Sequence, residues 1–302
     1  ALTALGAWGA IYNLLALRTA ERNQLLSRPG YGATLGSRIE RRAITTGLLA
    51  AALIVVIGPL TQALWLLPGS AKTDPTLPAE CQALSSYASQ QQCRDRDEWA
   101  FWDATRLVGM DVQDSTINEF PFFTFLFADL HAHMIALPLA MLALGLMVAV
   151  LKAENARANA KARSYIPTLV CLGALALTIG ALRATNTWDF PTYLALGCVT
   201  LGLIAWRNIQ RGASLPHTAL VWIGAVLWLL VGSTLLFLPF LRSFATDYAG
   251  FELWRGARTP AADMLRMNGL WLFFLVSGAV LLYWRRGAGL PLLLLIGLGP
   301  VV

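Results

Sequence analysis

Long apolar runs recur along this chain, and they constrain its fold more than any other feature. Residues 134–151 and 165–182 are two such runs, and neither contains a charged residue. A helix needs about 20 mostly apolar residues to cross the hydrocarbon core of a bilayer. The composition agrees, since 57% of the residues are hydrophobic and 13% are charged. The sequence therefore predicts an all-α, polytopic transmembrane protein.

The charged residues between the runs indicate how the chain crosses the membrane. Segments rich in Lys and Arg stay on the cytoplasmic side, so we expect the basic loops inside the cell and the intervening loops outside. We also expect one transmembrane domain, 1–302, in the cell membrane, as a fragment of a longer chain. The predicted spans number about eight, with the first and last truncated: 1–17, 43–67, 134–151, 165–182, 191–206, 217–240, 269–284 and one from about 290.

Two longer polar segments, residues 69–119 and 241–268, lie on the extracytoplasmic side in this topology. The first contains nine acidic and four basic residues, and long loops between spans often carry function. Cys81 and Cys93 lie in it. On an oxidising face we expect them to form a disulfide bond, worth roughly 3 kcal/mol in the chain-entropy model. The alternative is a pair of free thiols.

Residues 118–133, NEFPFFTFLFADLHAH, place two of the three histidines directly before an apolar run. If this stretch is helical, Asp129 and His133 are four residues apart and share a face. Asp129 then either orients His133 as a base or binds a divalent metal ion with it. His131 points about 200° away from Asp129 on a helix, so both histidines bind one metal only if the segment is not a regular helix. The alternative is a helix cap with interfacial histidines.

Two further polar clusters lie on the same predicted face. In TNTWD, residues 185–189, Trp188 suits stacking on a sugar ring or anchoring at the interface, while Asn186 and Asp189 also suit a turn and a helix cap. The second cluster consists of Arg255, Arg258 and Arg266. Arginine binds phosphate through paired hydrogen bonds; the alternatives are lipid headgroups or pairing with acidic neighbours.

Several stretches resemble one known family. These are TINEFPFFTFLFADLHAHMIALPLAMLAL at 116–144, TNTWDFPTYLAL at 185–196, LPF at 238–240 before a Thr-Pro pair, and LTALGAWGAIYNL at 2–14. They resemble the YYY membrane proteins, large polytopic proteins of Chloroflexi and archaea with a Tyr-Tyr-Tyr motif, which would lie upstream of residue 1. Ala132 stands where relatives often have Pro, which argues against a helix that starts directly after His131.

The YYY family is similar to the GT-C glycosyltransferases, which take a sugar from a lipid-phosphate donor at the external membrane face. The resemblance implies a GT-C-like fold and an acidic catalytic residue in an upstream loop. In this chain the resemblance implies three groups of residues: some catalyse the reaction or line an acidic pocket, some bind a divalent metal ion, and some contact the substrate. The catalytic candidates are Asp129, His133, Glu119 and Asp103; the metal candidates are Asp129, His131 and His133; the substrate-binding candidates are Asn118, Arg106, Asn186, Trp188, Asp189, Arg255, Arg258 and Arg266.

Other functions compete with this hypothesis. The alternative is a non-catalytic accessory or structural subunit of a larger membrane complex, such as a photosynthetic one. A transporter is disfavoured because the spans contain almost no charged residues and no inverted repeat is apparent. The net charge of +6 does not indicate nucleic-acid binding, since the charges lie in short loops between spans. We expect membrane lipids, a lipid-phosphate sugar donor and other membrane subunits as partners.

Overall fold

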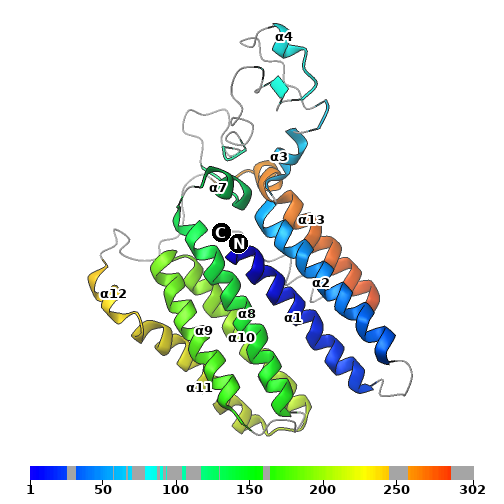
Figure 1. Cartoon of the computed structure of the whole chain (residues 1–302). Helices are drawn as coiled ribbons and strands as arrows, with labels where there is room; N and C mark the ends of the chain where they lie inside the picture. Colours follow the sequence, from blue (N-terminus) through cyan, green and yellow to red (C-terminus); the bar gives the residue numbers. More distant parts are fainter. Residues whose placement is uncertain are drawn as a thin grey trace. The chain divides into compact units, whose positions relative to one another are not determined.

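In the computed structural model, every regular secondary-structure element among the described residues is a helix, and these residues form no strand (Figure 1). The described residues are 1–25, 32–56, 58–65, 67–69, 79–86, 89–90, 93, 104–106, 117–128, 130–158, 164–244 and 258–286. The helices are α1 (Leu2–Leu25), α2 (Gly32–Val56), α3 (Leu60–Trp65), α4 (Ala79–Gln82), α7 (Pro121–Phe127), α8 (Ala132–Ala158), α9 (Ile166–Thr185), α10 (Asp189–Gln210), α11 (Leu215–Leu235), α12 (Leu238–Ser243) and α13 (Ala261–Arg286).

Five of the described helices are long and apolar enough to cross a membrane: α8, α9, α10, α11 and α13. The apolar part of α1, Leu2–Leu15, is shorter. In α2 the first half contains several charged residues, so its apolar part is also short. The total of eight spans stays a prediction, and the span expected from about 290 lies outside the described residues. The all-helical membrane fold itself is confirmed.

The helices group into two compact units, each built from segments that are far apart in the sequence. The first unit contains Ala1–Val56 and Ala128–Phe251, and the second contains Ile57–Phe127 and Glu252–Val302. Each unit is described by itself below. The single domain expected from the sequence, residues 1–302, stays a prediction.

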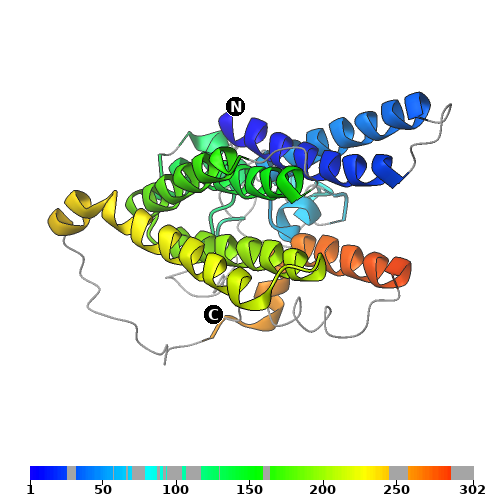
Figure 2. The same ribbon diagram turned by 90° about the horizontal axis from the view of Figure 1, so that it is seen from below.

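In the first unit, helices α8 to α11 pack side by side and α1 contacts both α2 and α8 (Figures 1 and 2). The core lies between α8, α9 and α11, where Ala143, Leu175, Ile179 and Leu229 are fully buried. Small residues let the backbones approach, as is usual between membrane helices. At Gly180 in α9, an added Cβ atom would meet the backbone oxygen of Ser233 at 2.6 Å.

In the second unit α3 packs against α13, and α7 contributes to a small apolar cluster. Phe120 and Phe123 are buried in this cluster with Ala104, and Met267 of α13 packs against it. A Cβ atom added at Gly58 would lie 2.9 Å from the Phe120 ring. Close packing of the segment before α7 against the segment before α3 therefore holds this unit together.

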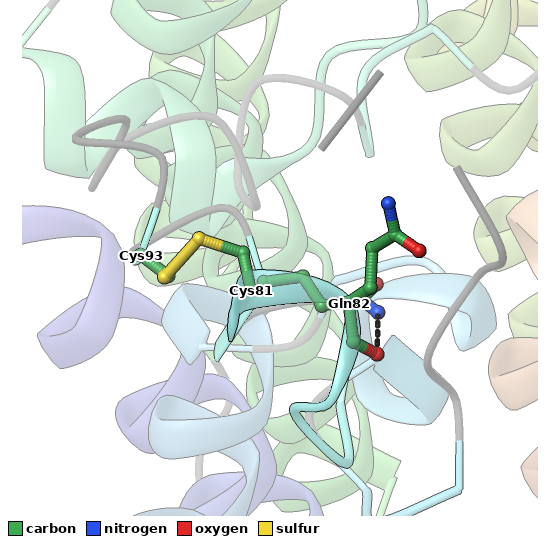
Figure 3. The surroundings of a disulfide bond; sticks show 4 residues. Cys81, Gln82 and Cys93 are labelled. Atoms are coloured by element: carbon green, nitrogen blue, oxygen red, sulfur yellow. Dashed lines mark hydrogen bonds between the residues drawn. A yellow bond between two sulfur atoms is a disulfide. The ribbon is translucent and has the colours of Figure 1, made fainter. Parts of the chain in front are cut away.

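A disulfide bond joins Cys81 and Cys93, the pair expected from the sequence, in the second unit (Figure 3). The side-chain amide of Gln90 donates a hydrogen bond of 3.4 Å to the carbonyl oxygen of Gln82 beside it. Cys81 is buried, with 1% of its surface exposed. The other two cysteines, Cys171 and Cys198, are free thiols in α9 and α10.

Two of the expected spans are interrupted for physical reasons, and helix α8 starts earlier than expected. The expected span 43–67 stops at Val56 and resumes at Leu60, because Pro59 lacks the N–H that a continuous helix needs. The expected span 217–240 divides between α11 and α12 at a turn before Pro239. Helix α8 begins at Ala132, so the argument from Ala132 against a start directly after His131 was wrong.

Candidate functional site

One end of the first unit gathers five of the residues singled out from the sequence. Helix α8 begins there, α9 ends there, and α10 begins there after the short turn 186–188. We call this region the Asp189 end. Its candidate residues are His131, His133, Asn186, Trp188 and Asp189.

The start of α8 sets the positions of the two histidines. The N–H of Ile135 donates the first helical hydrogen bond to the carbonyl of His131 (3.2 Å), so His131 precedes the helix and His133 lies in its first turn. Their ring centres are 5.7 Å apart. Leu130 and His131 are not helical, and the pairing of Asp129 with His133 stays a prediction. Asp129 itself lies outside the described residues.

Asp189 is the first residue of α10 and is half-buried. The side-chain amide of Asn186 donates a hydrogen bond of 3.1 Å to its carboxylate oxygen Oδ2. The imidazole of His133 and the phenol of Tyr193 are both close enough to Asp189 to interact with it electrostatically. The structure therefore places a histidine of α8 within electrostatic range of a carboxylate on α10.

Trp188 lies directly before this carboxylate, and 70% of its surface is exposed. On α9, the guanidinium of Arg183 lies 4.9 Å above the ring of Phe190. Arg183 and Tyr193 were not singled out from the sequence as site residues. A signal was available for both, since Tyr193 is four residues after Asp189 on the same helix face and Arg183 closes the helix before the turn.

The two histidines meet one requirement of a metal site. Imidazole nitrogens bind an ion such as zinc at roughly 2 Å. When two imidazoles bind the same ion, the centres of their rings therefore lie roughly 5 Å apart. The observed distance between the two ring centres, 5.7 Å, is close to this value. Among the described residues, no three His, Cys, Asp or Glu side chains are grouped to hold a metal ion. A third protein ligand would have to come from elsewhere in the chain, and Asp129 remains the candidate.

The second unit holds a separate group of predicted site residues, in which Arg106 and Asn118 meet at Thr105. The carbonyl oxygen of Thr105 accepts hydrogen bonds from the backbone N–H of Asn118 (2.6 Å) and from the Arg106 guanidinium (3.4 Å). Glu119 follows Asn118 and is half-buried before Phe120. Asp103, the remaining candidate of this group, lies outside the described residues.

Gln62 on α3 is a polar residue that the sequence did not single out. It is 6% exposed, and among the described residues neither atom of its side-chain amide has a hydrogen-bond partner; the same holds for the buried side-chain oxygen of Asn118. Buried polar groups are nearly always hydrogen-bonded. An apolar helical context hid Gln62, because LTQALW reads as part of a span.

The predicted arginine cluster is described only in part. Arg266 in the first turns of α13 pairs with Asp263 at 2.9 Å, which is the pairing that the sequence offered as an alternative to phosphate. Its side chain is still 55% exposed. Arg258 is exposed before α13, and Arg255 lies outside the described residues. Contact of these arginines with a phosphate stays a prediction.

Five long apolar helices define the chain as a polytopic α-helical membrane protein. The chain belongs to a family of uncharacterized membrane proteins, DUF2298, which it matches over residues 1–301. No curated protein and no solved structure matches the chain. The family match thus agrees with the membrane class derived from the helices.

Proposed function

We propose that this protein is a GT-C-type glycosyltransferase that transfers a sugar from a lipid-phosphate donor at the extracytoplasmic face of the cell membrane. One observation supports the proposal: His133 and Asp189, from two different helices, lie within electrostatic range of each other at one end of the first unit, and Trp188 beside Asp189 is exposed. The resemblance of both motifs to the YYY family and its GT-C relatives supports the same reading.

Each residue of the Asp189 end has a role in this proposal. The acceptor hydroxyl attacks the anomeric carbon of the sugar, the bond from that carbon to the phosphate oxygen breaks, and the hydroxyl proton passes to Asp189. Asn186 orients the carboxylate through the hydrogen bond to Oδ2, and His133 stabilises its charge before the transfer. Trp188 stacks on the sugar ring.

A divalent metal ion is part of the proposal, with His131, His133 and Asp129 as ligands. Such an ion supplies positive charge that stabilises the leaving phosphate. Residues of the second unit have assigned roles of their own. Arg255, Arg258 and Arg266 bind the phosphate of the donor, and Asp103, Glu119, Asn118 and Arg106 have acidic or substrate-binding roles. These assignments follow the family resemblance.

Transfer of labelled sugar from a polyprenyl-phosphate donor tests the proposal, with the full-length protein in membranes that contain the acceptor. We expect Asp189→Asn and His133→Ala each to lower the rate at least about 100-fold, the usual size of a general-acid–base effect. Arg207→Gln, at the opposite end of α10, is the matched control and should keep the wild-type rate. EDTA should abolish transfer and added divalent metal should restore it.

Two outcomes would contradict the proposal. Equal rates for wild type, Asp189→Asn and His133→Ala would remove the roles given to these residues. Absence of transfer by the wild type, together with co-purification of other membrane subunits at fixed stoichiometry, would favour an accessory subunit instead.

A further inference from the structure

The opposite end of the first unit contains a cavity that the proposed function does not use. It has a volume of about 1010 Å³ and is lined by residues of α8, α9, α10 and α11. Here α8 and α10 end and α9 and α11 begin. We call this region the Glu154 end; its polar residues are Glu154, Asn155, Arg157, Tyr165, Thr168, Arg211 and His217. The charge pattern of the loops predicts that it faces the cytoplasm.

A buried carboxylate with matched partners forms one wall of this cavity. Glu154 is 8% exposed, accepts hydrogen bonds from the Arg157 guanidinium (2.8 Å) and the Thr168 hydroxyl (2.8 Å), and lines the cavity with both. Arg157 also donates to the Tyr165 hydroxyl (3.2 Å) and lies 4.5 Å above its ring. The single negative charge of Glu154 is therefore balanced within the wall.

A second guanidinium enters the cavity from α10. Arg211 follows the last residue of α10 and donates a hydrogen bond of 3.2 Å to the side-chain oxygen of the buried Asn155. His217 in the first turn of α11 is exposed at the same cavity. Among the described lining residues, Glu154 is the only acidic one against two arginines. The cavity thus has an excess of positive charge at Arg211.

The rest of the lining is apolar. Leu172 of α9 and Leu201 of α10 are buried in the cavity wall, and Val221, Trp222 and Trp228 of α11 line it with exposed side chains. Leu172 and Leu201 belong to the helix core, so the apolar part lies between spans. A site with cationic polar groups at one end and hydrocarbon-lined walls beyond them fits an amphiphile with an anionic head.

We propose that this cavity binds one anionic phospholipid, with its phosphate at Arg211 and His217 and an acyl chain along Leu172, Val221 and Trp228. An arginine already held in place by Asn155 loses little freedom when it binds phosphate through paired hydrogen bonds. The large cavity and its apolar walls favour a lipid over a soluble phosphate, because a soluble phosphate would leave those walls uncovered.

Native mass spectrometry of the full-length protein tests this proposal, with phosphatidylglycerol and phosphatidylcholine as the probes. We expect the wild type to retain one phosphatidylglycerol at detergent concentrations that remove phosphatidylcholine. Glycerol phosphate at a large excess should not displace it. Arg211→Gln should lower the retained fraction at least about 10-fold; its control is Arg207→Gln, one turn earlier on α10, which does not line the cavity.

A cavity-filling variant tests the apolar part independently. An added Cβ atom meets nothing within 4 Å at Gly224 in the cavity wall, nor at Gly173 of α9, which does not line the cavity. We expect Gly224→Phe to abolish retention and Gly173→Phe to leave it unchanged. Equal retention of both lipids by the wild type, or wild-type retention by Arg211→Gln or by Gly224→Phe, would overturn the proposal, as would displacement by glycerol phosphate.

Discussion

The two ends of the helix group α8 to α11 surround their carboxylates, Glu154 and Asp189, with different partners. At the Glu154 end the buried carboxylate has an ion pair with Arg157 and a hydrogen bond from Thr168. At the Asp189 end the half-buried carboxylate accepts a hydrogen bond from an amide and lies near an imidazole. An arginine neutralises a carboxylate permanently, whereas a histidine can exchange a proton near neutral pH.

This difference in partners suits the two carboxylates to different roles, one in the stability of the fold and one in proton transfer. A carboxylate held by a guanidinium is suited to fix helices in place, because its charge is always compensated. A carboxylate next to an imidazole is suited to accept and release a proton. We therefore propose a structural role for Glu154 and, as part of the proposed function, a catalytic role for Asp189, and the variants below test that division.

The largest expected effect is on activity at the Asp189 end. Asp189→Asn keeps the size of the side chain and removes the base, so we expect about a 1000-fold loss of sugar transfer, within the range of general-base effects. The free energy of unfolding should change by less than about 1 kcal/mol. Initial rates and denaturant unfolding in the same detergent measure both. A large loss of stability with unchanged turnover would reverse the two assignments.

The next effect is on stability at the Glu154 end. Glu154→Ala leaves the Arg157 guanidinium without its carboxylate, and breaking a buried pair costs about 3–5 kcal/mol. Because the Arg157 side chain is 26% exposed, we expect the lower limit, about 3 kcal/mol. The measurement is the free energy of unfolding in detergent. Lys152→Ala, two residues earlier on α8, is the control, because it removes only an exposed hydrogen bond of 2.8 Å to Asn13 of α1; a loss equal to that control would contradict the structural role.

A smaller effect tests whether close helix packing supports the Asp189 end. Gly180→Ala forces a methyl group against the Ser233 oxygen and the Phe237 ring, and overpacking typically costs about 1–3 kcal/mol. Gly173→Ala on the same helix meets nothing within 4 Å and should be neutral or slightly stabilising. Thermal unfolding of the two variants compares them directly. Equal midpoints would show that α9 and α11 separate easily at this point.

The smallest effect isolates one hydrogen bond at the Glu154 end. Thr168→Val removes the hydroxyl that donates to Glu154 while keeping the shape of the side chain, and we expect a loss of about 1 kcal/mol. Thr178→Val is the control on α9, since that hydroxyl donates to the Ala174 carbonyl of its own helix. If both variants lose the same amount, the Thr168 bond adds nothing to the Glu154 network.

Hydropathy located five of the expected membrane helices among the described residues, but not their ends. The expected span 165–182 corresponds to α9, Ile166–Thr185. The span expected to end at 151 continues as helix to Ala158, because Lys, Ala, Glu and Arg are good helix formers although they are not all apolar. The sequence therefore assigned Glu154 to a loop and missed its buried network.

The sequence identified His133 and Asp189 as separate candidates, from polar residues at the ends of apolar runs. Their meeting depends on how α8 packs against α10, which local pattern does not encode. Helix α8 starts at Ala132, and because Asp129 lies outside the described residues, its pairing with His133 stays a prediction. Gln62 was hidden from the sequence, because its burial without a hydrogen-bond partner among the described residues is a property of the folded chain.

Whether the disulfide bond between Cys81 and Cys93 forms in a cell depends on the side of the membrane on which this segment lies. Thiols in the cytosol are kept reduced, whereas those outside the membrane oxidise. The alkylation state of these two cysteines in intact cells therefore reports on which side of the membrane their segment resides. Cys171 and Cys198, which are free, provide the internal reference in the same molecule.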